Sequence, residues 1–341
     1  MASAGGPASE GVIKSLQKVG YQIIGVGADP YDLAISSADK KYKISFAKDA
    51  TYLEELLEII ESEKPDLIHA QNDEEVFKIS EMREQIELHT KTFLPSKEAV
   101  RVCTNKFESY KKFQKAGLSV PRNIFINDEK DLIESFRDLR ENESQKIWIR
   151  SNDISGGGKG SLPTSSLEFA REWINHHDGW GTFMAAEILT SETVTWQSVW
   201  KDGELVVAQT RKRSGWVHGN RAVSGVTGVT RVGVTHSDPE IDSLAIAAIK
   251  AVDENPNGIF GVDFAIDKNG TPNPTEINIG RFFTTILFFT TAGLNMPEIY
   301  SNLALGGHKY IGKTINPLPN GLIWVRSMDN APKIMTEKDL F

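Results

Sequence analysis

Cysteine is almost absent from this sequence of 341 residues, in which Cys103 is the single example. One cysteine excludes a disulfide framework and a zinc site built from several cysteines, and it is typical of a reducing compartment. The sequence also lacks any apolar run close to the roughly 20 residues that span a bilayer. Its first residues show neither the basic start nor the apolar segment of a secretory signal. We therefore predict a cytoplasmic protein with no membrane partner.

Positive charge is also in deficit, because 38 Lys and Arg residues stand against 46 Asp and Glu residues, for a formal net charge of −8. A surface with this balance repels phosphate backbones, so we predict no nucleic-acid partner, although a local basic pocket is compatible with it. Hydrophobic residues make up 40% of the sequence and charged residues 25%, which is typical of a globular protein. The length predicts about two or three compact units.

The first hundred residues alternate between helical patterns and short apolar runs. The apolar runs are 21–26, 66–70 and 91–94, and the helical patterns are 11–19, 51–63 and 73–88. Strands separated by single helices predict a parallel sheet with helices on its faces, which is a Rossmann-like unit. Such a unit opens with a strand, but only four residues precede the glycine turn Gly5-Gly6-Pro7. We therefore expect a sheet that lacks its first strand or a chain that begins late.

After residue 95 the pattern becomes α+β. The strand-like runs are 123–126, 146–150, 183–188, 193–200 and 204–209, and the helical patterns are 105–116, 128–140, 165–177, 239–252 and 296–305. The runs 193–200 and 204–209 are joined only by Lys201-Asp202-Gly203, which predicts an antiparallel pair. The expected fold class is therefore α/β at the start of the chain and α+β in the remainder.

The segment 259–281 carries the first chemical signal. Asn269-Gly270 is the preferred pair for a two-residue type I′ hairpin turn. The register that this turn implies pairs 268 with 271, 266 with 273, and Asp263 with Glu276. Two opposed carboxylates repel each other unless a cation lies between them, and Asn278 adds an oxygen on the same face. Such ligands suit Mg²⁺ or Mn²⁺ held together with substrate phosphates, and an ordinary exposed acidic hairpin is the alternative.

A second signal lies at 146–160, where an apolar strand ends in Arg150 and runs into Gly156-Gly157-Gly158-Lys159-Gly160. Glycines allow backbone N–H groups to approach phosphate oxygens, and Arg150 and Lys159 supply positive charge. A flexible surface loop is the alternative. The strand that ends in arginine immediately before the loop favours a phosphate site.

Together these two stretches, about 110 residues apart, resemble the ATP-grasp superfamily, and more specifically one half of the carbamoyl-phosphate synthase large chain and its short stand-alone relatives. The likeness covers nearly the whole chain and is carried by GGPASEGVIKSLQKVGYQIIGVGADP, TNKFESYKKFQKAGLSVP, IRSNDISGGGKG and GVDFAIDKNGTPNPTEIN. It implies a Rossmann-like pre-ATP-grasp domain at 1–96 and a two-lobed ATP-grasp domain at 97–341. The smaller lobe would span about 120–190 and the larger lobe about 191–341.

The resemblance also implies roles for individual residues. Asp263, Glu276 and Asn278 would bind the metal, and Arg281 and Arg150 would act on the transferring phosphoryl group. The nucleotide-binding set would be Lys106, Arg150, Ser155, Gly156, Gly157, Gly158 and Lys159 at the phosphates, Glu187, Ile188 and Leu189 at adenine, and Glu192 at the ribose. Glu192 and Arg281 each stand about one position away from the family pattern. These displacements predict either weaker nucleotide binding or a shift in the local geometry of the site.

The resemblance implies an ATP- and Mg²⁺-dependent ligase that activates a carboxylate as an acyl phosphate and joins it to an amine or similar nucleophile. Its partners would be small molecules, and a homodimer is compatible with the relatives. The absence of any Ser/His/Asp or Cys/His set fits this mechanism, because phosphoryl transfer needs positioning and charge stabilisation rather than a side-chain nucleophile. The alternatives are a non-catalytic nucleotide-binding subunit and, from another class, an NAD(P)-dependent dehydrogenase.

Three further patterns have simpler readings. Arg211-Lys212-Arg213 is either a solvated strand end or the basic lining of a pocket for an acidic substrate, and its position after a strand pair beside the nucleotide favours the pocket. Cys103 is expected to be a small core residue. The segment Gly307–Thr314 matches a P-loop pattern by chance, because a helix precedes it and Ile315-Asn316-Pro317 prevents a helix from following.

Overall fold

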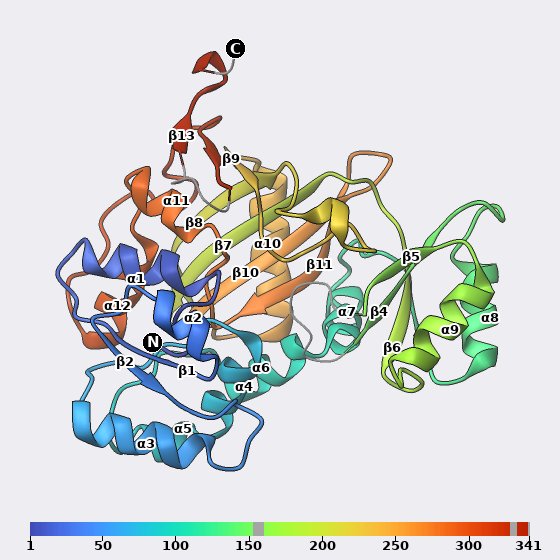
Figure 1. Ribbon diagram of the computed structural model, residues 1–341. Coiled ribbons are helices and arrows are strands. Elements are labelled where there is room, and N and C mark those ends of the chain that lie inside the picture. Colours follow the sequence, from blue (N-terminus) through green and yellow to red (C-terminus); the bar gives the residue numbers. More distant parts are fainter. Residues whose placement is uncertain (153–159, 328–332, 340–341) are drawn as a thin grey trace.

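The computed structural model describes residues 1–152, 160–327 and 333–339 (Figure 1). It contains an N-terminal unit of short parallel strands and helices, a seven-stranded antiparallel sheet, and a four-stranded lobe that projects to one side. The α/β and α+β prediction is confirmed. Within these described residues, no helix has the length and apolar character needed to cross a membrane.

In the N-terminal unit, residues 1–4 fill the place of the strand that the sequence appeared to lack. The strands are β1 (Ile24–Gly27) and β2 (Lys40–Lys43), which pair in parallel. Residues 1–4 lie beside β1, where Val26 N–H donates to the Met1 carbonyl at 2.9 Å. On their other side, Ala2 N–H donates to the His69 carbonyl at 2.8 Å. The segment thus continues the sheet without forming a regular strand.

The helices of this unit cover the short strands. They are α1 (Ser9–Gln17), α2 (Pro30–Ile35), α3 (Tyr52–Glu63), α4 (Asp73–Glu81) and α5 (Arg83–Ile86). The single helix expected over 73–88 is divided at Met82, whose ψ of 15° departs from helical geometry. α4 begins at Asn72, whose side chain accepts from Glu75 N–H, and this cap fixes the orientation of the first turn.

The small lobe is an antiparallel sheet with two helices. Its elements are β3 (Asn123–Ile126), β4 (Ile147–Ser151), β5 (Leu162–Thr164), β6 (Phe183–Glu187), α8 (Glu129–Asp138) and α9 (Leu167–His176), with the strand order β3-β6-β4-β5. Ile147 and Ile149 on β4 and Ile174 on α9 are fully buried in a core made only of residues from this lobe. The lobe therefore encloses its own hydrophobic core.

The large sheet has the strand order β11-β10-β7-β8-β9-β12-β13. Its strands are β7 (Thr193–Lys201), β8 (Glu204–Arg213), β9 (Val232–His236), β10 (Gly258–Ile266), β11 (Pro272–Ile279), β12 (Ile323–Val325) and β13 (Lys333–Met335). The helices around it are α6 (Lys97–Thr104), α7 (Lys106–Lys115), α10 (Pro239–Val252), α11 (Ile286–Thr291) and α12 (Met296–Leu305). α10 covers β7, β10 and β11, while α11 and α12 pack against α1 (Figure 1).

The N-terminal unit and the large sheet share their cores. One cluster joins Tyr52 and Leu56 of α3 to Trp196 and Phe260 of the large sheet, and a second joins Ile13 of α1 to residues of α11 and α12. Packing therefore continues across the predicted boundary at residue 96. The division into two domains at residue 96, and of the second domain into two lobes, remains a prediction.

The turn between β10 and β11 differs from the predicted type I′ turn. Gly270 N–H donates to the Asp267 carbonyl at 3.1 Å, and Asp267 N–H donates to the Thr271 carbonyl at 3.0 Å. The loop thus has three residues and ends with Gly270 at φ 86°, a type I turn followed by a left-handed residue. The Asp267 carboxylate stabilises it by accepting from the backbone N–H groups of Asn269 and Thr271. The two-residue prediction was wrong.

The register beyond this turn returns to the prediction through a β-bulge. Ile266 pairs with Pro272, and not with residue 273, because the loop is one residue longer. A bulge between Asp263 and Phe264 then shifts the register, so that Asp263 lies opposite Glu276. The predicted pairing of the two carboxylates is confirmed, although the turn that suggested it is different.

Candidate functional site

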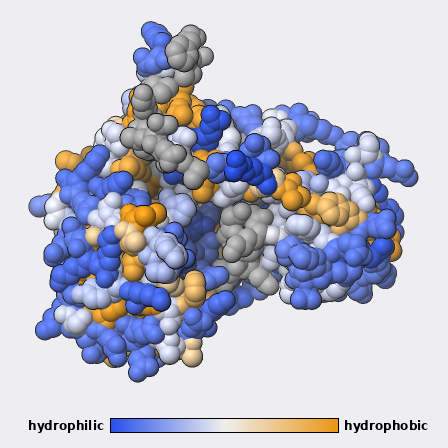
Figure 2. Space-filling model, viewed as in Figure 1, coloured by the Kyte–Doolittle hydropathy of each residue, from blue (hydrophilic) through white to orange (hydrophobic). Residues whose placement is uncertain are grey.

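A cavity of about 570 Å³ lies between the N-terminal unit and the large sheet. In Figure 2 a hydrophilic hollow opens on this face, between the main body and the small lobe. The predicted site residues that line the cavity are Lys106, Arg150, Asp263, Glu276, Asn278 and Arg281. On the opposite side the cavity is lined by loops of the N-terminal unit, including Gly6, Asp29 and Asp73. The fold thus brings together residues that are far apart in the sequence.

One wall of the cavity is a row of side chains across four neighbouring strands. Glu276 on β11 pairs with Asp263 on β10, Asp263 pairs with Thr195 on β7, and Thr195 pairs with Arg211 on β8. Directly opposed residues of antiparallel strands project from the same face. The sheet therefore runs from two carboxylates at one end of the row, through a hydroxyl, to a guanidinium at the other.

Asp263 already has several hydrogen-bond partners. Its Oδ1 accepts from Thr195 Oγ1 at 2.5 Å and from Arg213 Nη2 at 3.3 Å, and its Oδ2 accepts from Asn278 Nδ2 at 3.1 Å. The Glu276 carboxylate, in contrast, forms no hydrogen bond with any residue that the structure describes. Of the two predicted acidic ligands, Glu276 is the one whose oxygens face the cavity uncommitted.

Arg281 is fixed by an ion pair with the N-terminal unit. Its Nε and Nη2 donate to the two carboxylate oxygens of Asp73 at 2.5 and 3.0 Å, and Nη2 also donates to Asn278 Oδ1 at 2.6 Å. Burial lowers the pKa of Arg281, but Asp73, Glu276 and Asp263 together outweigh this effect, so that the pKa lies above its usual value. Asp73 lies in the capped first turn of α4, and this contact was not evident from the sequence.

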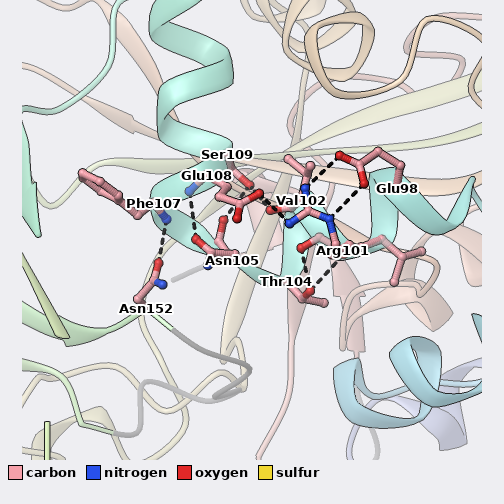
Figure 3. Close-up of polar contacts among 10 residues, drawn as sticks. Glu98, Arg101, Val102, Thr104, Asn105, Phe107, Glu108, Ser109 and Asn152 are labelled. Atoms are coloured by element: carbon pink, nitrogen blue, oxygen red, sulfur yellow. Dashed lines mark hydrogen bonds and ion pairs between the residues drawn. The ribbon is translucent and has the colours of Figure 1, made fainter. Parts of the chain in front are cut away.

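Lys106 and Arg150 both line the cavity, where the start of α7 meets the end of β4. Figure 3 shows Asn105, Phe107 and Asn152 at this junction. The Asn105 side chain caps this helix by accepting from Glu108 N–H at 2.9 Å. Lys106 N–H donates to the Asn152 carbonyl at 3.2 Å, and Phe107 N–H donates to Asn152 Oδ1 at 2.7 Å. Since Asn152 directly follows β4, these contacts dock α7 onto the strand that carries Arg150.

Arg150 is a half-buried cation near the Glu276 carboxylate. Burial lowers its pKa, and Glu276 acts in the opposite direction. Its Nε is buried and has no hydrogen-bond partner in the described part of the chain. A buried donor without a partner is unusual in native proteins and points to a ligand or an ordered water.

The predicted adenine and ribose residues lie apart from this cavity. The Glu187 carboxylate accepts from Arg122 N–H and Nε at 2.8 and 3.1 Å, and the Glu192 carboxylate accepts from Lys212 at 2.8 Å. Neither residue lines the cavity, and the same holds for Ile188 and Leu189. Ser155, Gly156, Gly157, Gly158 and Lys159 lie outside the described residues. These nucleotide-binding roles remain predictions.

The donor set at the acidic end of the row fits a hard divalent cation that takes other ligands from phosphates. Over 1–152, 160–327 and 333–339, no group of three or more His, Cys, Asp and Glu residues can hold a metal by itself. Glu276, Asp263 and Asn278 instead offer two carboxylates and one amide oxygen on adjacent strands. This set is too small for a closed structural site, but it suits a metal that arrives with a nucleotide.

Two simpler expectations agree with the structure. Cys103 is buried, and burial raises the pKa of its thiol. The P-loop-like segment follows α12, and no helix begins between it and β12 in the described chain. The match to the P-loop pattern is therefore a coincidence of sequence.

The chain is similar in fold to several solved enzymes. It superposes on carboxyaminoimidazole ribonucleotide synthase from Aspergillus clavatus complexed with ATP with a TM-score of 0.71 and 16% identity, over 95% of this chain and 80% of that one. It also superposes on the biotin carboxylase domain of Hydrogenobacter thermophilus 2-oxoglutarate carboxylase with MgADP, ADP and bicarbonate. There the TM-score is 0.71 and the identity 15%, over 95% of this chain and 73% of that one. For the L-amino acid ligase from Bacillus licheniformis the TM-score is 0.70 and the identity 11%, over 95% of this chain and 77% of that one.

These similarities show that the chain shares the fold of these enzymes over 95% of its length. No protein-family model matches the sequence, and no curated protein matches it. At these identities the similarity concerns the fold alone.

Proposed function

We propose that the chain is an ATP- and Mg²⁺-dependent ligase that activates a carboxylate as an acyl phosphate and joins it to an amine or similar nucleophile. The observation that carries this proposal is one cavity lined by Lys106, Arg150, Glu276, Asn278 and Arg281. Two further observations support it. Four motifs resemble one half of the carbamoyl-phosphate synthase large chain, and enzymes of similar fold include complexes with ATP and MgADP and an amino acid ligase.

In this proposal Glu276, Asp263 and Asn278 hold Mg²⁺ or Mn²⁺. When bound, the metal would neutralise phosphate oxygens of the nucleotide. Lys106 and Arg150 supply further positive charge at the phosphates, and the sequence resemblance assigns Ser155–Lys159, which lie outside the described residues, to the same phosphates. Glu187, Ile188 and Leu189 contact adenine, and Glu192 contacts the ribose.

The reaction needs two displacements. A carboxylate oxygen of the substrate attacks the γ-phosphorus, and the bond from that phosphorus to ADP breaks. The amine nitrogen then attacks the acyl carbon, phosphate leaves, and the amine proton passes to solvent. Arg281, fixed by Asp73, contributes charge near the transferring group without having to reorganise.

A screen for ADP release tests the proposal. The protein is incubated with Mg²⁺-ATP and with pools of carboxylic acids and amines, and a pool that raises ADP release above the background identifies an enzyme. Glu276→Gln is expected to abolish this release without changing the melting temperature. Glu204→Gln is the matched control, because Glu204 is an exposed residue at the start of β8 and lies outside the cavity.

One observation favours a second candidate, a nucleotide-binding subunit without catalysis. Asp263 and Arg281 are already paired, with Arg213 and Asp73 respectively. If Mg²⁺-ATP raises the melting temperature and no pool increases ADP release, the second candidate is correct. A rise in melting temperature with NAD(H) but not with Mg²⁺-ATP would contradict both.

A further inference from the structure

Arg211 is a buried cation whose partners are all neutral. Only 1% of the residue is exposed. Its Nη1 donates to Thr230 Oγ1 at 3.2 Å and to Thr285 Oγ1 at 2.5 Å, and its Nη2 donates to Thr195 Oγ1 at 2.9 Å. Three hydroxyls thus orient the guanidinium, but none of them compensates its charge. A buried charge is costly unless an opposite charge pairs with it.

Arg213 lies two residues further along β8 and shares the same surroundings. Its Nη2 donates to Thr195 Oγ1 at 3.0 Å and to Asp263 Oδ1 at 3.3 Å, and its side chain is 9% exposed. Both arginines therefore bind the Thr195 hydroxyl, but only Arg213 pairs directly with Asp263. The Nε atoms of Arg211 and Arg213 are buried and have no partner among the described residues.

The charges of this cluster do not balance. Burial lowers the pKa of Arg211 well below its usual value, the neighbouring Arg213 and Arg326 act in the same direction, and Asp263 acts against them. An aromatic ring fixes the plane of each guanidinium. Arg211 Cζ lies 4.5 Å from the centroid of the Phe283 ring, and Arg213 Cζ lies 4.0 Å from the centroid of the Trp216 ring. The cluster is therefore rigid, positively charged and open to the cavity, which both arginines line.

We propose that Arg211 and Arg213 bind a second anionic group, a carboxylate or a phosphate, on the acid that the enzyme activates. This inference rests on the proposed ligase function and narrows its substrate class to acids with at least two anionic groups. A guanidinium presents a fork of donors that matches the oxygens of carboxylate and phosphate. The existing Arg213–Asp263 pair would be shared with the incoming anion.

The position of the cluster relative to the acidic end of the row sets the length of the substrate. Arg211 and Glu276 lie on strands three positions apart, which corresponds to about 14 Å at the usual strand spacing. A metal and a transferring phosphoryl group beside Glu276 would occupy part of this distance. Short acids of the size of succinate or glutarate would reach from the phosphoryl group to the arginines.

The inference predicts tighter binding of dianions than of monoanions of equal length. The test is calorimetric titration of the full chain, with and without Mg²⁺ and a non-hydrolysable ATP analogue. The dianions are succinate, glutarate and 3-phosphonopropionate, and butyrate and valerate are the monoanions of matched length. At least one dianion should bind about 10-fold more tightly than its matched monoanion, because it gains charge-assisted hydrogen bonds. Comparison of succinate with 3-phosphonopropionate, whose acidic groups are separated by the same two methylene groups, shows whether the second group is carboxylate or phosphate.

Variants then assign the effect to the cluster. Arg211→Gln and Arg213→Gln should each weaken binding of the preferred dianion about 10-fold or more and leave the monoanion within about 2-fold. Arg231→Gln is the matched control, because Arg231 is an exposed arginine outside the cavity. If Arg211→Gln fails to fold, because Arg211 is buried, then Arg213→Gln, at the less deeply buried of the two arginines, still tests the inference.

Dianions that bind no more tightly than monoanions, or folded variants that bind the dianion like the wild type, would overturn the inference. These outcomes can be separated from failure of the proposed function. A protein that releases no ADP with any acid and amine is not a ligase, whereas a dianion preference that depends on Arg211 and Arg213 would still show the anion site.

Discussion

The two walls of the cavity treat their hydrogen-bonded carboxyl groups differently. On the sheet wall, the Asp263 carboxylate has an arginine partner, with Oδ1 at 3.3 Å from Arg213 Nη2. On the wall of the N-terminal unit, Glu75 is buried without an arginine or lysine partner among the described residues. It accepts from the hydroxyls of Ser3 and Tyr52, and burial raises its pKa to about 7.

Because of this difference, the two walls are suited to different chemistry. The strand register of the sheet places two carboxylates at one end of a row and Arg211 at the other, so the sheet wall can hold a metal and an anion in fixed positions. The N-terminal wall offers a carboxyl that is largely protonated below neutral pH. We expect phosphoryl transfer to take place at the sheet wall. We expect the wall of the N-terminal unit to make the stability of the folded protein depend on pH.

The largest expected effect comes from removing the uncommitted charge of the sheet wall. Glu276→Gln should reduce ADP release by at least about 100-fold, because the neutral amide no longer attracts the metal that compensates the phosphate charge. The melting temperature should stay close to that of the wild type, since Glu276 forms no hydrogen bond within the described chain. An active variant would show that the metal is held elsewhere.

On the N-terminal wall, Glu75→Gln should change how stability depends on pH. The pKa of Glu75 is about 7 in the folded protein and about 4.5 when unfolded, so the folded state binds the proton more tightly and wild-type stability falls as pH rises between these values. The variant lacks this titration. Its free energy of unfolding relative to wild type should increase by roughly 2–3 kcal/mol from pH 5 to pH 8.

Urea unfolding at the two pH values measures this change. Glu74→Gln is the control, because Glu74 is the exposed neighbour of Glu75, and its difference from wild type should stay constant. Parallel curves for Glu75→Gln and the wild type would show that Glu75 is solvated and that the two walls do not differ.

The shared hydroxyl of the sheet wall should matter less. Thr195→Val keeps the shape of the side chain but removes the oxygen that binds Arg211, Arg213 and Asp263, and it should lower the free energy of unfolding by about 2 kcal/mol. Thr193→Val on the same strand is the control, since Thr193 forms no side-chain hydrogen bond within the described chain. Equal losses for both variants in urea unfolding would contradict a special role for Thr195.

The smallest effect concerns the turn that presents the acidic end of the sheet wall. Gly270→Ala should cost about 1 kcal/mol, because φ is 86° at this residue, whereas an added Cβ meets no atom within 4 Å. Asn269→Ala should change stability by less than about 0.5 kcal/mol, since Asn269 does not adopt positive φ. In a type I′ turn both substitutions would be costly, so thermal unfolding of the two variants distinguishes the turns.

Local signals allowed the elements to be predicted. α10 and α12 match the expected ranges 239–252 and 296–305, because Asp238 and Asn295 cap them and a proline stands in each first turn. Asp263 opposite Glu276 was predicted for a partly mistaken reason, since the longer loop and the bulge offset each other. A bulge has no clear sequence signal, so such an agreement is fortunate.

The remaining parts of the site depend on long-range packing. Arg281 and Asp73 are 208 residues apart, and no local pattern relates them. A bulge between Val199 and Trp200 shifts the β7–β8 register, so the pairing of Thr195 with Arg211 could not be derived from the connecting residues. The basic segment was recognised as a candidate pocket lining, but its buried threonine partners come from three other parts of the chain.

The shared core of the N-terminal unit and the large sheet has a practical consequence for dissection of the chain. A fragment that starts after residue 96 would lose Tyr52 and Leu56 from the cluster around Trp196, and its exposed apolar surface would favour aggregation. The small lobe, which encloses its own core, is the part to excise or to exchange with the corresponding lobe of another protein.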